Sequence, residues 1–379
     1  IFFSSTNILF EETIHQIDIQ FTEFDNILVP FAVNNKKSAF PFDPFAAGFY
    51  LISRYEEYLP YIKDQHERFS PNQSLAFRNY FLKKPVINIW AQNIEEKIKS
   101  FYPNFKTKKK EFTFVPTIDI DSAYAYRLKG IIRSIGGYLK SLKKFDFSEI
   151  IERTKVLTGL SNDYFDTYSN LSFIHQKYNL RPIFFILFAR YGTFDKNIPI
   201  NNQKFHSLIK MLDDEADVGI HPSYASNSNI NILKEEINNL SNVLNRPITK
   251  SRQHFLKLSM PQTYRNLLEL GITDDYTMGY ASEIGFRASI ASPFNFYDLE
   301  MDIETNLIIH PFAFMEGTLR DYHNKDANSA KPIIYSLIDE VKKVNGTFIS
   351  LWHNESLCNK KRWVGWDQLY NDMIEYALY

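Results

Sequence analysis

From residue 112 to the C-terminus, short apolar segments alternate with amphipathic helical patterns, and this alternation constrains the fold more than any other feature. The apolar runs, rich in Phe, Ile and Val, lie at 112–118, 183–189, 217–220, 249–255, 272–276, 307–314 and 347–352. Helical patterns lie between several of these runs, at 203–214, 230–244, 262–270 and 331–344. Strands that alternate with helices form a parallel sheet with the helices outside it. About seven such units favour an α/β fold, an irregular (β/α) barrel of parallel strands, over an open doubly wound sheet.

The preceding part of the chain lacks this alternation. Within it, residues 43–59 predict a helix, because apolar residues recur at three- and four-residue intervals after the start signal Asp43-Pro44. The lysine-rich stretch 106–110 is typical of a linker. We therefore expect a smaller N-terminal accessory α/β domain over 1–108, without catalytic residues, and the (β/α) barrel over 109–379.

Composition excludes several classes of protein. The chain has 43 basic and 44 acidic residues, a net charge of -1, so we expect no nucleic-acid partner. No run approaches the roughly 18–20 apolar residues of a membrane span, so we expect no transmembrane segment. The single Cys358 cannot form an intrachain disulfide. We therefore expect a cytoplasmic protein, although a chain that begins at Ile1 could have lost a leader.

Familiar catalytic motifs are missing from the sequence, and this narrows the chemistry. No G-x-G-x-x-G turn follows a predicted strand, which argues against a dinucleotide domain. No G-x-S-x-G turn supports a serine nucleophile, and no C-x-x-C or H-E-x-x-H zinc signature occurs. The oligomeric state is not predicted.

Polar residues gather where the predicted strands end. The C-terminal strand ends of a parallel barrel share one rim, and active sites are built there. Asp119 and Asp121 lie at the end of the first run, two residues apart, so their side chains point the same way. Two carboxylates on one face repel each other unless a cation lies between them, and a metal together with Arg252 would supply it. The alternative is that one aspartate caps a helix and the other faces solvent.

Two histidines also follow predicted strands. His221 comes directly after 217–220, and neutral imidazole is the commonest metal ligand, so His221 with Asp121 indicates metal binding. His353 follows the last run and is a candidate general acid, because its ordinary pKa of about 6.5 lets it hold and release a proton. For both, the alternative is a buried imidazole bonded to a backbone carbonyl. We expect the histidines outside the predicted strands to be surface or packing residues, namely His15, His66, His175, His206 and His323.

Five segments in order resemble the polysaccharide deacetylases, carbohydrate esterase family four, which includes the chitin deacetylases. They are TIDIDSAYAYRLKG at 117–130, GIHPSY at 219–224, RQHFL at 252–256, DDYTMGY with GFRAS at 274–289, and LWHNESL at 351–357. More narrowly, the chain resembles a bacterial branch with an N-terminal companion domain, because DPFAAGFYLISRYEEY resembles that domain. The resemblance implies a barrel that removes acetyl groups from carbohydrate with a divalent metal, most often zinc.

The resemblance also implies a role for each matching residue. Asp119 matches the catalytic base, and Asp121 matches the metal-binding aspartate. His221 matches the first metal histidine, and Arg252 matches the arginine that positions the base. His353 matches the catalytic acid.

The chain departs from the family pattern at three places. Ala225 stands where the family carries its second metal histidine. Ile120 separates the two aspartates, which are adjacent in many members. The arginine motif reads Arg-Gln-His-Phe and lacks the usual proline and tyrosine.

The missing histidine raises the question of a third metal ligand. A catalytic zinc normally keeps three protein ligands and one open position, and Asp121 and His221 supply only two. The remaining candidates are His254, His310 and Ser226, and imidazole binds zinc better than a hydroxyl. His254 lies two residues after Arg252 on the same predicted strand, so both should face the site. We therefore expect His254 to be the third ligand; alternatively, it lines the substrate cleft.

These observations predict a metal-dependent hydrolase that removes N-acetyl or other acyl groups from a sugar, polysaccharide or glycolipid. The alternative is a non-catalytic deacetylase-like barrel that binds glycan. A glycosidase, which needs two carboxylates flanking a sugar and no metal, ranks last, because Asp119 and Asp121 come from one strand.

Overall fold

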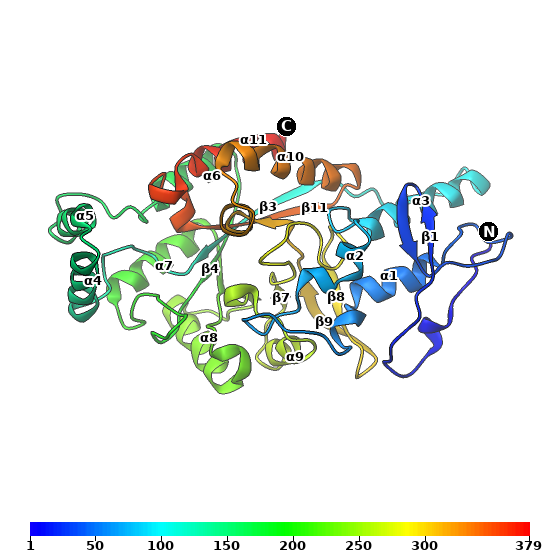
Figure 1. Ribbon diagram of the computed structural model, residues 1–379, viewed down its shortest axis with the longest axis horizontal. Helices are drawn as coiled ribbons and strands as arrows, with labels where there is room; N and C mark the ends of the chain where they lie inside the picture. Colours follow the sequence, from blue (N-terminus) through cyan, green and yellow to red (C-terminus); the bar gives the residue numbers. More distant parts are fainter. The chain divides into compact units, whose positions relative to one another are not determined.

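The computed structural model describes residues 1–379 and has a mixed α/β fold (Figure 1). The strands are β1 (Phe21–Phe24), β2 (Ile27–Pro30), β3 (Thr113–Ile120), β4 (Ile183–Ile186), β5 (Asp217–Ile220), β6 (Lys250–Ser251), β7 (Asp274–Asp275), β8 (Phe294–Asp298), β9 (Ile303–Ile309), β10 (Phe314–Met315) and β11 (Thr347–His353). The helices are α1 (Pro44–Ile52), α2 (Leu75–Arg78), α3 (Val86–Phe101), α4 (Ile131–Lys143), α5 (Phe147–Leu157), α6 (Tyr168–Lys177), α7 (Gln203–Glu215), α8 (Ile230–Leu244), α9 (Gln262–Glu269), α10 (Ala327–Lys343) and α11 (Trp366–Leu378).

The chain divides into two compact units. The first unit comprises Ile1–Phe114 and Phe255–Ser350, and the second unit comprises Val115–His254 and Leu351–Tyr379. Two of the boundaries between the units, after Phe114 and after Ser350, fall inside strands β3 and β11. The predicted division into 1–108 and 109–379 stays a prediction. No helix is long and apolar enough to cross a membrane.

Parallel strands form the centre of the second unit. The strand order there is β11-β3-β4-β5-β6, and the pairs β3/β4, β4/β5 and β5/β6 are parallel. In this register Asp119 of β3 lies beside Phe185 of β4, which lies beside Gly219 of β5. A Cβ at Gly219 would come within 2.8 Å of the Lys250 carbonyl oxygen and the Phe185 ring, so only glycine fits. The predicted α/β class with a large parallel sheet is confirmed.

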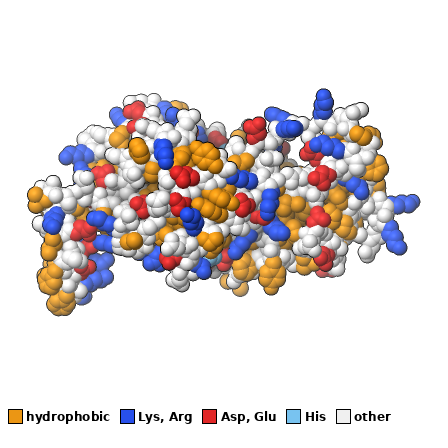
Figure 2. All heavy atoms as spheres, turned by 90° about the horizontal axis from the view of Figure 1, so that it is seen from above, with side chains coloured by type: hydrophobic (Ala, Val, Ile, Leu, Met, Phe, Trp, Pro, Cys, Tyr) orange, Lys and Arg blue, Asp and Glu red, His pale blue; other side chains and the backbone are white.

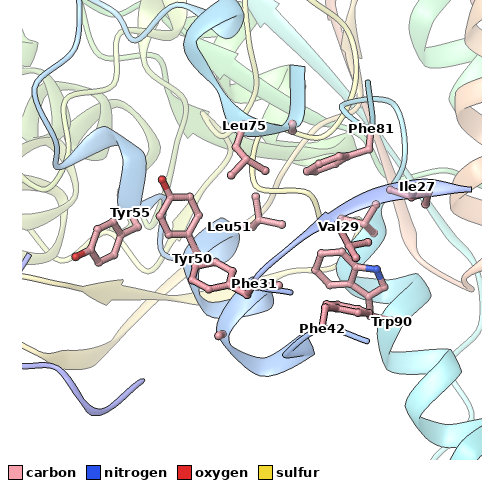
Figure 3. Close-up of a cluster of buried hydrophobic side chains, with 14 of the residues drawn as sticks. Ile27, Val29, Phe31, Phe42, Tyr50, Leu51, Tyr55, Leu75, Phe81 and Trp90 are labelled. Carbon is pink, nitrogen blue, oxygen red and sulfur yellow. The ribbon is translucent and has the colours of Figure 1, made fainter. Parts of the chain in front are cut away.

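The N-terminal part of the first unit has an aromatic core. The β1–β2 hairpin turns through Asp25 and Asn26, both with positive φ, as a two-residue hairpin turn requires. Helix α1 begins where the Asp43 carboxylate accepts the amide hydrogens of Phe45 and Ala46. Behind these elements lies a cluster of buried side chains (Figure 3), including Val29, Phe31, Phe42, Tyr50, Leu51, Leu75 and Trp90.

The C-terminal part of the first unit contains an antiparallel pair that the sequence did not predict. Strand β7 is parallel to β9, but β8 pairs with β9 in the antiparallel direction. The predicted strand at 307–314 began too late, because the first half of β9, Ile303 to Asn306, is mostly polar and exposed. It also ended too late, since β9 stops at Ile309, two residues before Pro311.

Two other predicted elements were too long. The predicted strand at 249–255 is reduced to β6, because the chain turns at His254 and passes through left-handed conformations at Phe255 and Leu256. The predicted helix at 43–59 stops with α1 at Ile52, and Arg54 adopts a left-handed conformation with φ of 56°.

Arg54 leaves the helical path because its guanidinium belongs to a buried ion-pair network in the first unit. It donates to Glu57 at 2.7 Å and to Glu56 at 2.9 Å. Arg287, distant in sequence, donates to both oxygens of the same Glu57 carboxylate at 2.9 and 2.6 Å. Burial opposes ionisation of Glu57, but the two arginines outweigh it and hold the pKa of Glu57 below its usual value. One carboxylate therefore joins the two sequence segments of this unit.

We expect Glu57→Gln to destabilise the protein by about 3–5 kcal/mol, because it leaves two buried guanidinium groups without their shared anion. Urea unfolding would measure the change. Glu300→Gln is the matched control: Glu300 pairs with Arg265 at 3.0 Å but is 52% exposed, so its loss should cost less than about 1 kcal/mol. Equal effects for the two variants would contradict a structural role for the network.

Candidate active site

The six residues predicted to carry the chemistry come together in the second unit. Asp119 lies near the end of β3, and Asp121 is the first residue after this strand. His221 follows β5, and His353 is the last residue of β11. Arg252 and His254 follow β6, where the hydrogen bonds from Arg252 N to Ile220 O and from His254 N to Pro222 O keep the chain beside β5. The ends of four strands of one sheet, β11, β3, β5 and β6, thus supply the site.

A buried ion pair fixes Asp119. Arg252, which is fully buried, donates from Nη1 to Asp119 Oδ1 at 2.9 Å and to the Thr117 hydroxyl at 2.7 Å. The guanidinium carbon lies 4.6 Å from the ring centroid of Phe185, so the cation also rests on an aromatic face. The other carboxylate oxygen, Asp119 Oδ2, lies 3.7 Å from His221 Nε2. Arg252 therefore both orients the carboxylate and compensates its charge.

Asp121, His221 and His254 form the Asp–His–His cluster. Each offers one ligand atom, and these three atoms lie within 4.8 Å of one another. His221 Nε2 is 3.2 Å from Asp121 Oδ1, and His254 Nε2 is 3.5 Å from Asp121 Oδ2. Two ligands of a tetrahedral zinc, each bonded at about 2.0–2.1 Å, lie about 3.3 Å apart. The Asp–His separations match that spacing.

A hydrogen bond from Nδ1 holds each of the two imidazoles of the cluster. His221 Nδ1 donates to the backbone carbonyl of Arg252, and His254 Nδ1 donates to Asp195 Oδ1 at 2.8 Å. A hydrogen bond at Nδ1 fixes the ring and leaves Nε2 as the available ligand, which is the usual outer support of a metal-binding histidine. Both Nε2 atoms lie within 3.5 Å of Asp121.

Electrostatics and hydrogen bonding in the cluster suit a cation. Asp121 Oδ1 is buried and accepts no hydrogen bond, although His221 Nε2 is near. Burial by itself raises the pKa of Asp121, but attraction to His254, with contributions from His221 and His353, holds the pKa well below its usual range. For His254, burial lowers the pKa, but Asp121 and Asp195 outweigh it and raise the pKa to about 9. The residues therefore fit a divalent metal held by two nitrogens and one oxygen.

His353 lies at the edge of the cluster. Its Nε2 is 3.8 Å from Asp121 Oδ2, and its side chain is 20% exposed, so it borders both the buried residues and solvent. The next residue, Asn354, is buried and donates from its amide nitrogen to the carbonyl oxygen of Ser122 at 3.2 Å and to the Tyr168 hydroxyl at 3.3 Å. Asn354 thus ties the end of β11 to the loop after β3.

The sequence analysis missed two aspartates that support the site. Asp195, in the loop after β4, bonds His254 and also accepts the amide of Tyr224 at 3.0 Å. Asp163 is buried and accepts the amides of Ala125, Tyr126 and Arg127, which fixes the loop that follows Asp121. Asp195 could have been found as an acidic residue after a strand on the active-site rim. No local pattern points to Asp163.

The other candidate ligands lie outside the cluster. His310 belongs to the first unit, where its Nε2 is 2.7 Å from Asp274 and its ring stacks on Tyr276. The Ser226 hydroxyl donates to the carbonyl oxygen of Ser223. Ala225 lines a cavity of about 220 Å³ whose wall also includes Asp195 and Glu236.

Glu236 is a buried carboxyl on the wall of this cavity. It lies in α8, is 4% exposed and accepts the Ser223 amide at 3.0 Å. Burial raises the pKa of Glu236 to about 7, with a further contribution from Asp195, and the bonds from Ser223 and Ser226 only partly oppose this.

One known family matches the N-terminal part of the chain. A family described as "Family of unknown function (DUF7033)" matches residues 1–103. No curated protein matches the sequence.

Several solved structures are similar to this chain. One is a protein from Mycobacterium smegmatis assigned as a polysaccharide deacetylase, with 12% identity and a TM-score of 0.46 over 72% of this chain and 85% of that one. Another is Puue allantoinase, with 11% identity and a TM-score of 0.45 over 72% and 86%. A third is a polysaccharide deacetylase from Bacillus cereus, with 12% identity and a TM-score of 0.34 over 70% and 88%.

We expect Glu236→Gln to make the protein more stable than wild type above pH 7, by about 3–4 kcal/mol. The folded pKa of Glu236 is raised, so its contribution to stability is fully present below the unfolded pKa of about 4.3 and is lost as the pH rises through about 7. Unfolding curves at several pH values would measure this difference. The neighbouring Glu235→Gln, at a 43% exposed side chain, should show little change at any pH. A pH-independent difference for Glu236→Gln would contradict the raised pKa.

Proposed function

We propose that the protein is a metal-dependent hydrolase that removes N-acetyl or other acyl groups from a sugar, polysaccharide or glycolipid. One observation carries the proposal: the Asp–His–His cluster lies next to a second carboxylate, Asp119, which a buried arginine holds in place. The motifs that resemble polysaccharide deacetylases support the same reaction.

Asp121, His221 and His254 would hold the metal, and zinc suits two imidazoles and a carboxylate best. When bound there, such a metal polarises an acyl carbonyl and lowers the pKa of a water molecule. His254 would take the place of the histidine that the family carries where this chain has Ala225. Its bond to Asp195 supports this role, because outer carboxylates commonly orient metal-binding histidines.

The remaining residues would move protons. Asp119 would accept the proton of the attacking water, and Arg252 would hold this carboxylate oriented toward His221. His353, at the exposed edge of the cluster, would donate a proton to the leaving amine. The reaction would then cleave the C–N bond of an acetamide and release a free amino group on the sugar.

Measurements of zinc binding and of acetate release would also test two other functions. A non-catalytic deacetylase-like protein that binds glycan is favoured by one observation, Ala225 in place of the family histidine. A glycosidase would need two carboxylates on opposite sides of a sugar. Asp119 and Asp121 instead both approach the Nε2 atom of His221, at 3.7 and 3.2 Å, which argues against that reaction.

We expect His254→Ala to weaken zinc binding by at least about 100-fold, because it removes one of three ligands, and Asp195→Asn to weaken it by about 10- to 100-fold. Zinc titration of the purified protein with a competing chelator would measure both. His206→Ala is the control, since His206 bonds the Ile200 carbonyl oxygen, away from the cluster. Unchanged zinc affinity in His254→Ala would remove His254 from the metal site.

We expect Asp119→Asn to keep zinc content near wild type but to lose about 10²- to 10⁴-fold in turnover, because a general base is removed. Acetate release from N-acetylglucosamine oligomers would measure turnover for N-acyl groups, and release from acetylated xylan would measure it for O-acyl groups. Wild-type rates in Asp119→Asn would refute the base. A wild-type protein that binds zinc and glycan but releases no acetate from either substrate would favour the non-catalytic alternative.

A further inference from the structure

Helix α4 presents its apolar face to solvent. Five large aliphatic side chains on this one helix are more than half exposed: Ile131 (79%), Ile132 (88%), Ile135 (54%), Leu139 (62%) and Leu142 (53%). At 100° per residue they fall within an arc of about 100°, so they form one continuous stripe. Amphipathic helices on globular proteins usually turn such a stripe toward the core.

The opposite side of α4 is small and polar and packs on α5. A Cβ at Gly137 would come within 2.4 Å of the Arg153 guanidinium, so α5 approaches α4 where α4 carries no side chain. The Tyr138 hydroxyl hydrogen-bonds the Thr154 hydroxyl at 2.9 Å. Ser141, facing the same way, is the only buried residue of the helix. The polar side of α4 is therefore inside and its apolar side is outside.

Cations border the apolar stripe. No acidic residue occurs between Asp121 and Asp146. The exposed Lys140, Lys143 and Lys144 at the end of α4 form no ion pair, although the Asp146 carboxylate at the start of α5 attracts Lys144. The acids of the adjoining α5 are already compensated, Glu149 by Arg153 and Lys361, and Glu152 by Lys360 and Lys361. In Figure 2 the end of the view where α4 and α5 lie shows hydrophobic side chains, with Lys and Arg and also Asp and Glu side chains beside them.

We infer that α4, with the α4–α5 turn, docks on the surface of an anionic lipid bilayer. Thirteen residues of helix span about 20 Å, too short for the roughly 30 Å hydrocarbon core, so the helix would lie in the interface. Exposed Phe145 and Phe147 at the turn extend the apolar surface. An apolar stripe flanked by lysines fits lipid tails and anionic headgroups together. A partner protein would have to match both the apolar stripe and an excess of positive charge.

The helix is held firmly enough to act as a docking element. Arg133 donates to the carbonyl oxygens of Asn197 and Lys196 at 2.6 and 2.7 Å, and its guanidinium lies 4.4 Å from the ring centroid of Tyr191. The loop that Arg133 contacts carries Asp195, which accepts a hydrogen bond from His254. Docking would therefore bring the active-site loop toward carbohydrate at a membrane surface. The inference about lipid binding does not depend on the proposed activity.

The test is co-sedimentation of the full chain with vesicles of phosphatidylcholine alone or mixed with phosphatidylglycerol. We expect binding to the anionic vesicles that weakens as salt is raised. Ile132→Glu with Leu139→Glu should reduce it by at least about tenfold. Lys140→Gln with Lys143→Gln and Lys144→Gln should reduce it on the order of 100-fold. Phe173→Glu, at a 67% exposed phenylalanine of α6 in the same unit, should bind like wild type.

Circular dichroism would verify that each variant is folded, and all substituted positions are exposed. The inference is overturned if wild type stays in solution with both kinds of vesicle, or if the α4 variants bind as well as wild type. It is also overturned if wild type is a dimer that does not sediment with vesicles and Ile132→Glu with Leu139→Glu makes it a monomer. In that case the stripe joins two copies of the chain.

Discussion

The buried Arg252–Asp119 ion pair is the interaction on which the site depends. A fully buried guanidinium is costly to desolvate, and a carboxylate, a hydroxyl and an aromatic face all contact this one. The Arg252 carbonyl oxygen also accepts the Nδ1 hydrogen of His221, so one residue orients the proposed base through its side chain and a proposed metal ligand through its backbone. A change at Arg252 would therefore disturb both.

The site is organised through its outer contacts as much as through the reacting groups. Asp195 fixes the ring of His254, Asp163 fixes the loop after β3, and Asn354 fixes the end of β11. Each contact joins segments that are distant in sequence, and each satisfies groups that would be costly to leave buried and unbonded. His254 reaches the Asp–His–His cluster from the segment after β6, and the Asp195 carboxylate holds its ring there.

The α4–α5 hairpin shows the opposite use of apolar residues. The cluster around Phe42 and Trp90 turns its rings inward, whereas α4 turns its isoleucines and leucines outward and Gly137 and Ser141 inward. An apolar helix face left in water is costly, so a surface that keeps one needs a partner. The lysines beside the stripe form no ion pair, which indicates that this partner carries negative charge. The hairpin and the site meet at one loop, because Arg133 grips the segment that carries Asp195.

Local sequence patterns predicted much of the fold and of the candidate site. Alternating apolar runs and helical periodicities predicted the α/β class, β5 and α8 to the residue, and polar residues at strand ends marked six side chains that the structure brings together. The predicted strand at 249–255 failed because Arg252 and His254 are held by buried long-range contacts, while the chain turns at Phe255, and strand propensity does not register either. The helix at 43–59 broke at Arg54 because the Glu57 carboxylate and the Arg287 carbonyl oxygen accept hydrogen bonds from its guanidinium in the interior. The periodicity of apolar residues in the sequence indicates which residues prefer burial. Only the tertiary structure decides which partners the buried charges have and which apolar face remains exposed. The reason is that those contacts join residues far apart in the chain.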